Sequence, residues 1–493
     1  MAEPITYLNM KKPVWLIISV LITAGLLHPA AGFAQIDTVT FDVAAELLFP
    51  SFPVKSSYTS LFDKRDGQHY LYSANMEFGL GIYDTADPTL LSTVQNLGIA
   101  TFDNLDVSTV EQRNNSLFVG IGDFQVKDNV ASGLAILDIT DPETPVVKDI
   151  WDSTAFQRGI SHLIIDGDYA YLTTMKDGLL ILRVQDENHI QFVSSLQLDL
   201  SFPAPSGNAH NARGLQIRND TLYVCFDRGG LRLVDVTDKQ HPVEIYQYVN
   251  PVLNASAGAA YNDIALKGHF AFVSVDYCGL EVLDIGAIPF TSVLWYNPWN
   301  CNFTNWSGAA IHTNELILAN NDSLLFVTGG QSELFVFDVT DPETTVKIGE
   351  FVNLYDTLAT SGLDVYDNRV SLSFLHTPVH IPPFTPFFSD PGGLKILDYQ
   401  VDLLSSGTSE KSKGGIRIFP NPATDRIVVE AGTGIEELTL FDLLGRELVA
   451  AEFHQTLERV ELPIQGALPG GVYFVKVKIS DNQVFTKKIV LKN

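Results

Sequence analysis

The sequence predicts an all-β protein: a seven-bladed β-propeller followed by a small β-sandwich. One hexapeptide recurs seven times, apolar runs are short and rich in β-branched and aromatic residues, and long helical patterns are missing. The copies recur at intervals of roughly 50 residues, the size of one propeller blade. They begin at Gly79, Gly133, Gly178, Gly230, Gly279, Glu333 and Gly393.

Each copy reads as a strand that is buried on both faces. Its second and fourth residues are aliphatic, as in Leu134 and Ile136, and its fifth is apolar. Such continuous apolar character is typical of a strand packed between two sheets. The sixth residue is Asp in six copies and Arg183 in the third. An Asp at a strand end accepts N–H bonds from the next turn, so we assign these acids to turn structure.

Two further apolar runs precede each copy and a variable segment follows it, which gives four strands per unit and seven units over about residues 38–402. A closed ring hides strand edges that an open array would expose. Two segments are alternatives for the last strand of the final blade. Val401 to Leu404 would complete it locally, whereas Thr38 to Val43 would join both ends of the ring.

The N-terminus predicts export. Lys11 and Lys12 precede an apolar stretch, residues 14–27, that is too short to span a bilayer comfortably, and cleavage is expected after Ala34. Met10 fits the start of a signal peptide better than Met1 does. The predicted parts are therefore a signal peptide (1–34), the propeller (35–404), a Ser/Gly/Lys-rich linker (405–415) and a C-terminal domain (416–493), with no transmembrane segment in the mature form.

The charge is strongly acidic, with 31 basic and 58 acidic residues and a formal net charge of -27. The C-terminal domain is nearly neutral, so the acidity belongs to the propeller. Such a surface repels phosphate backbones and argues against nucleic acid as a partner.

Motifs of common hydrolases, nucleotide-binding proteins and EF-hands are not found in the sequence. The candidates for chemistry are polar residues expected on the innermost strands, where they face the central channel. If the histidines converge, they suit a divalent metal or acid/base work; otherwise they form hydrogen bonds between blades. No cofactor is predicted beyond that alternative. The catalytic candidates are His162, His210, Asp263 and His312.

A loop between the fifth and sixth blades gathers aromatic residues and asparagines, which suits stacking on sugar rings or a protein contact. Its ligand-binding candidates are Trp295, Tyr296, Trp299 and Trp306. Of the three cysteines, Cys278 and Cys301 are candidates for a disulfide. The alternative is isolated core thiols.

Two resemblances follow from these motifs. The strands LAILD, LRLVD, LEVLD and LKILD resemble the LVIVD repeat family, which implies an exported or surface propeller. The segments IRIFPNPATDRIVVE, LTLFDLLGREL, LPGGVYFVKV and FTKKIVLKN resemble the type A sorting domain of type IX secretion. That resemblance implies a bacterium of the Bacteroidota, recognition by the secretion machinery, removal of the tail, and release or attachment at the cell surface.

The expected function is a non-catalytic propeller that binds a glycan or protein, or serves as a scaffold. The alternative is a secreted hydrolase or lyase acting on polysaccharide, with its site in the central channel.

Overall fold

The computed structural model divides into two compact units at Leu404. Ile36–Leu404 forms the larger unit and the chain after it the smaller. The described residues are 36–50, 56–123, 130–203, 210–254, 260–276, 278–297, 312–329, 333–352, 358–376, 389–403, 416–419, 423, 426–442, 446–463, 468, 471–480 and 484–491. The predicted signal peptide and linker lie outside them. No helix of the described residues is long and apolar enough to cross a membrane.

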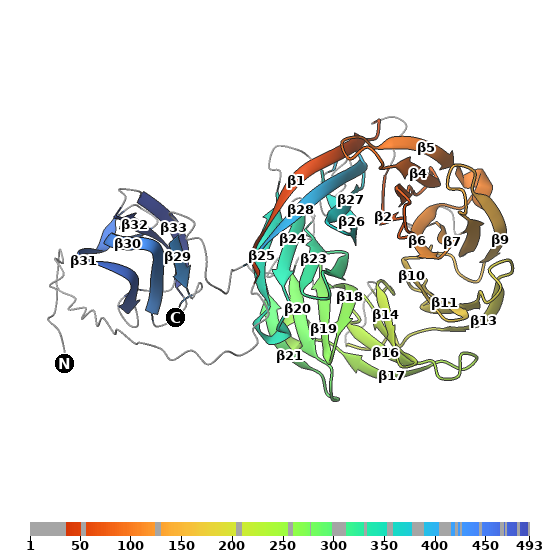
Figure 1. Ribbon diagram of the computed structural model, residues 1–493. Helices are drawn as coiled ribbons and strands as arrows, with labels where there is room; N and C mark the ends of the chain where they lie inside the picture. The colour runs from red at the N-terminus through yellow and green to blue at the C-terminus, as the bar shows by residue number, and fades with distance from the viewer. Residues whose placement is uncertain are drawn as a thin grey trace. The chain divides into compact units, whose positions relative to one another are not determined.

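The larger unit is a propeller of seven four-stranded antiparallel sheets (Figure 1). The first four blades run from the channel outward as β2 (Thr59–Phe62), β3 (Tyr70–Ala74), β4 (Leu80–Asp84) and β5 (Ser92–Leu97); β6 (Val107–Arg113), β7 (Ser116–Gly122), β8 (Ser132–Asp138) and β9 (Val146–Ser153); β10 (His162–Asp166), β11 (Tyr169–Thr173), β12 (Leu179–Arg183) and β13 (Gln191–Leu196); and β14 (Leu215–Arg218), β15 (Thr221–Cys225), β16 (Leu231–Asp235) and β17 (Val243–Tyr248).

The last three blades are β18 (Tyr261–Lys267), β19 (Phe270–Val275), β20 (Leu280–Asp284) and β21 (Thr291–Tyr296); β22 (Leu316–Ala319), β23 (Leu324–Thr328), β24 (Leu334–Asp338) and β25 (Val346–Phe351); and β26 (Thr360–Tyr366), β27 (Arg369–Phe374), β28 (Gly393–Leu403) and β1 (Ile36–Leu48). Short helical turns are α1 (Pro251–Asn254), η1 (Ile99–Phe102) and η3 (Pro342–Thr344).

The N-terminal strand closes the ring. β1 is the outermost strand of the seventh blade and pairs with β28 from Ile36 opposite Leu403 to Leu48 opposite Gly393. Closure by Val401 to Leu404 is wrong, because Val401 to Leu403 continue β28 itself. One blade therefore contains strands from both ends of the propeller sequence, which removes the open edge that a linear array would leave.

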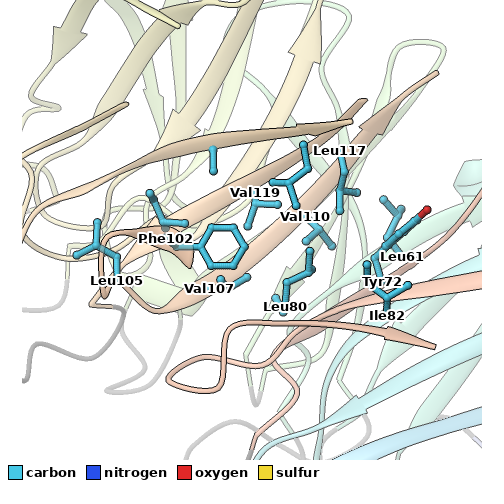
Figure 2. Packing of buried hydrophobic residues seen from close by; sticks show 14 of the residues in the cluster. Leu61, Tyr72, Leu80, Ile82, Phe102, Leu105, Val107, Val110, Leu117 and Val119 are labelled. Carbon is cyan, nitrogen blue, oxygen red and sulfur yellow. The ribbon is translucent and has the colours of Figure 1, made fainter. Parts of the chain in front are cut away.

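The repeated motif forms the third strand of every blade, buried between neighbouring sheets as predicted. Figure 2 shows one such interface, where Leu80 and Ile82 of β4 pack with Val107, Val110 and Val119 of the second blade. Burial of apolar area between the sheets is the dominant stabilising contribution to such a ring. The hydrophobic clusters follow one another from blade to blade.

The Asp that ends this strand has the structural role that the sequence predicts. In five blades its Oδ1 accepts the backbone N–H of the residue two positions on, at 2.7–2.9 Å. The sixth, Asp398, lies 3.3 Å from Arg369 Nε, while β28 continues past it. The five turn acids are Asp84, Asp138, Asp235, Asp284 and Asp338.

Glu333 departs from the glycine found at this motif position, and the structure gives the reason. Its backbone is left-handed (φ 58°), a conformation that costs a non-glycine residue free energy. Its carboxylate lies 3.1 Å from Lys395 Nζ of the next blade, and both side chains are almost fully buried (0% and 1% exposed). The ion pair joins the sixth blade to the seventh.

The smaller unit consists of β29 (Ile416–Phe419), β30 (Arg426–Asp442), β31 (Glu447–Pro463), β32 (Gly471–Ile479) and β33 (Val484–Leu491). These strands form one five-stranded sheet. One half of β30 pairs with β29 and the end of β31, and the other half pairs with β32 and the start of β31. Residues such as Ile427, Leu438 and Val477 form its hydrophobic core.

Candidate functional site

The innermost strands bring two rings of side chains to the central channel. Strand pairing places one residue of each blade at the first position: Tyr58, Ser108, Ser161, Arg213, Asn262, Asn314 and Ser361. The next residue of each blade forms the second ring: Thr59, Thr109, His162, Gly214, Asp263, Glu315 and Gly362. Both positions are polar or glycine in every blade, although the strands that follow them are apolar.

Carboxylates of the channel hold neighbouring blades together. Asp263 Oδ2 accepts the N–H of Leu316 at 3.0 Å, which joins blades five and six. Equivalent bonds cross the next two joints, where Glu315 Oε2 accepts from Leu363 N (2.9 Å) and Asp364 Oδ2 from Phe62 N (2.8 Å). Thr59 Oγ1 also donates to Glu315 (3.1 Å). These acids satisfy buried backbone donors, which is a structural role.

Two glycines of the second ring leave space for these carboxylates. A Cβ at Gly214 would lie 2.2 Å from Asp263 Oδ1, and one at Gly362 would lie 2.9 Å from Glu315 Oε2. A larger residue at either position would therefore displace atoms of a neighbouring blade.

Burial raises the pKa values of these channel acids. It raises the pKa of Glu315 to about 8, and the negative charge of Asp263 adds to the shift. Burial also raises the pKa of Glu111 to about 7, against the lowering effect of Lys64. The pKa values of Asp263 and Asp364 are raised by burial too, opposed by His162 and Lys64 respectively. The channel thus contains carboxyl groups that hold protons near neutral pH.

A polar network connects several blades at the end of the channel where the innermost strands begin, which we call the channel mouth. Tyr58 of the first blade is hydrogen-bonded to Arg213 of the fourth and to Ser161 of the third. Because blades one and four lie across a seven-bladed ring from each other, this contact crosses the channel. Asp227 and Asp276, which begin turns in blades four and five, flank the Arg213 guanidinium and act to raise its pKa against the lowering effect of burial.

The structure places the three candidate histidines in different surroundings. His162 is half-buried beside Asp263, in the second ring. His210 is buried, has Nε2 3.0 Å from the carbonyl oxygen of Phe202, and contacts the Phe226 ring edge-on. His162 and His210 thus make separate local contacts. The catalytic role of these two histidines stays a prediction.

His312 is the candidate histidine with a carboxylate at hydrogen-bond distance. Its Nδ1 lies 2.6 Å from Asp276 Oδ1, and both side chains are almost fully buried. Through Asp276 this pair is connected to the network around Arg213. Among the described residues, no three His, Cys, Asp or Glu side chains come together in a way that would hold a metal ion.

The aromatic candidates are only partly within the described residues. Trp295 and Tyr296 end β21, where Trp295 Nε1 donates to the carbonyl of Cys278 (2.7 Å) and Tyr296 packs edge-on against Phe337. Trp299 and Trp306 lie outside the described chain, as does Cys301. The ligand role of the loop and the disulfide with Cys278 therefore stay predictions.

Sequence reasoning did not single out Tyr58, Asp227, Asp276 or Glu315. One signal was present: the residue three positions before the motif glycine is Met76 or Met175 in blades one and three but Asp227 or Asp276 in blades four and five. Alignment of the copies shows this change from Met to Asp at one turn position. The residues at that position, Met76, Met175, Asp227 and Asp276, all have positive φ.

Two family models match the chain. The model of the secretion system C-terminal sorting domain matches residues 417–492, and that of the LVIVD repeat matches residues 209–250 and 257–288. The chain thus contains LVIVD repeats and a C-terminal secretion sorting domain. The LVIVD matches cover the fourth blade and the first three strands of the fifth, which contribute Arg213, Asp227 and Asp276 to the channel mouth.

Solved structures similar to this chain include WD40 propellers. The RRP9 WD40 repeats align over 73% of this chain and 100% of their own, with a TM-score of 0.50 and 9% identity. The C-terminal WD40 domain of Sif2 aligns over 74% and 99%, with a TM-score of 0.45 and 10% identity. At this identity the RRP9 likeness supports the propeller fold alone.

A curated relative is similar over a short stretch. The endo-acting ulvan lyase of Formosa agariphila is 28% identical over 94 residues, which are 19% of this chain and 18% of the lyase. The chain thus spans about a fifth of the length of this relative.

Proposed function

We propose that the protein is an exported propeller that binds a glycan or protein ligand without changing it chemically. The sorting domain indicates export by type IX secretion, to the cell surface or the medium. The observation that carries the binding role is that channel carboxylates are engaged in holding blades together: Asp263, Glu315 and Asp364 each accept a backbone N–H of the following blade. Carboxylates that accept these inter-blade hydrogen bonds are poorly placed to exchange protons with a substrate.

Export through the tail is tested by truncation. A chain that ends at Leu404 keeps all seven blades and lacks β29 to β33. We expect it to accumulate folded in the periplasm of a host with type IX secretion, whereas the full chain leaves the cell. Fractionation with antibodies to the propeller measures this, and a chain truncated only after Val490 controls for loss of a few terminal residues. Normal export of the shorter chain would refute the assignment.

The binding role is tested with the full chain on a glycan array and by thermal shift. We expect at least one glycan or protein ligand to bind and be recovered unchanged. Chromatography of the ligand after long incubation separates the two functions, since a shortened product would refute the non-catalytic proposal.

A second candidate function has one specific observation in its favour. His312 is held 2.6 Å from Asp276, whose charge also acts on Arg213, and a histidine oriented by a carboxylate is a common general base. A polysaccharide lyase or hydrolase would use such a base. His312→Gln should then abolish product formation while His210→Gln leaves it intact. Equal effects of the two substitutions would refute a catalytic role for His312.

A further inference from the structure

The channel mouth combines a floor and a rim of groups that are partly exposed. Tyr58 and Arg213 form the floor, because their hydrogen bond crosses the channel. Asn262 and Asn314 stand beside them in the same ring, and all four residues remain partly exposed. An aromatic ring, a planar guanidinium and side-chain amides in one ring of residues are groups that recognise hydroxyl-rich rings by stacking and hydrogen bonding.

The rim amides are held in place by the scaffold. Asn262 Nδ2 donates to the carbonyl of Thr313 (3.0 Å) and to Asn314 Oδ1 (3.1 Å), which links blades five and six at the mouth. Asn211 Nδ2 donates to Asp227 Oδ2 (2.8 Å), so a third amide is oriented by a carboxylate of the same network. Fixed rotamers reduce the entropy lost when a ligand binds.

The charge of the mouth restricts which rings it can accept. Arg213 is the cation of the floor, and Asp227 and Asp276 both lie close enough to act on its charge. A guanidinium flanked by two carboxylates has no net positive charge to offer an acidic ligand. The propeller around it is acidic as well, so an anion approaching the mouth meets unfavourable potential at long and short range.

We propose that the channel mouth binds oligosaccharides that lack acidic groups, with neutral and amino sugars favoured over uronates and sulfated sugars. This inference rests on the proposed binding function and specifies its ligand class and place. Tyr58 supplies the stacking surface, Asn262 and Asn314 hydrogen-bond ring hydroxyls, and Asp227 with Asp276 excludes carboxylate and sulfate substituents.

The test uses the full chain on an array that contains neutral, amino, uronate and sulfated oligosaccharides, followed by titration calorimetry of the strongest hits. We expect the hits to lack acidic groups. Tyr58→Ala and Asn262→Ala should each weaken binding at least tenfold, while Tyr70→Ala, on the second strand of the first blade, leaves it within twofold. Circular dichroism confirms that each variant is folded.

A charge variant gives a readout that a purely structural role would not produce. Asp227→Asn removes one carboxylate beside Arg213 and should raise the affinity for uronate oligosaccharides relative to neutral ones by about tenfold. Acidic hits on the array, or neutral hits that ignore Tyr58 and Asn262, would overturn the inference while leaving a binding propeller. If no glycan binds at all, the inference fails, and capture of a protein ligand by the full chain shows whether the proposed function survives it.

Discussion

Replacing Glu315 by Gln should stabilise the propeller in alkaline solution. The pKa of this carboxyl group is raised from 4.5 to about 8, chiefly by burial. The folded chain therefore keeps a proton that the unfolded chain has lost. The stabilisation due to this proton is complete below the unfolded pKa of 4.5 and is lost as the pH rises through the folded pKa of about 8.

The size of the effect follows from the shift. A change of 3.5 pKa units, from 4.5 to about 8, corresponds to about 5 kcal/mol at most. Because Glu315 is partly exposed to the channel, solvent and relaxation reduce this, and we expect roughly 2 kcal/mol. Gln can still accept the N–H of Leu363 through its Oε1, so the inter-blade bond is kept.

Urea denaturation of the full chain, followed by tryptophan fluorescence, measures this. Residues 405–493 contain no tryptophan, so the signal reports on the propeller. Glu315→Gln should match the parent within about 1 kcal/mol near pH 5 and exceed it by roughly 2 kcal/mol near pH 9. Glu343→Gln, at an exposed position, is the control, and its free energy of unfolding should match that of the parent at both pH values. A difference between Glu315→Gln and the parent that does not change with pH would show that Glu315 holds no proton in the folded chain.

Three further predictions concern the ring itself. Glu333→Ala removes the nearer carboxylate (3.1 Å) beside the buried Lys395 and leaves it with Glu46 at 3.5 Å, so it should cost about 3 kcal/mol in urea, whereas adding Lys395→Met should restore most of it; equal losses would contradict this. Asp138→Ala removes the acceptor of a turn N–H (2.9 Å) and should cost about 1 kcal/mol, and Asp141→Ala, which removes the acceptor of the Glu143 N–H (3.1 Å), should cost a similar amount. Deletion of residues 36–48 exposes β28 and should replace the single thermal transition with a broad one and aggregation, visible by calorimetry and light scattering; a sharp transition would refute closure by β1.

The repeats made the fold predictable, because each blade repeats the same local pattern. Consecutive aliphatic residues such as Leu134 and Ile136 require two buried faces, and the Asp after them requires a turn, so strand and turn follow from a few adjacent residues. Closure depended on a contact between Ile36 and Leu403, the two ends of the ring. The local sequence pattern allowed either Val401 to Leu404 or Thr38 to Val43 as the last strand. Only the pairing of strands in the folded ring decides between the two segments.

The channel site was less predictable for the same physical reason. His162, Asp263 and His312 could be expected near the channel from strand order, but their partners come from other blades. The Tyr58 contact to Arg213 joins residues far apart in sequence across the ring. Gly214 is explained only by the carboxylate of Asp263 that occupies the place of its missing side chain. Such constraints arise from closure, which no single repeat encodes.

Hydrogen exchange on the full chain, with and without a bound oligosaccharide from the array, shows where the ligand binds. Chromatography of the ligand afterwards shows whether it has been cleaved. An exported binding propeller with its site at the channel mouth should show added protection in peptides that contain Tyr58, Arg213 and Asn262, while the ligand is recovered intact. Protection confined to outer strands such as β17 or β21 would contradict a site at the channel mouth, and a cleaved ligand would contradict a non-catalytic propeller.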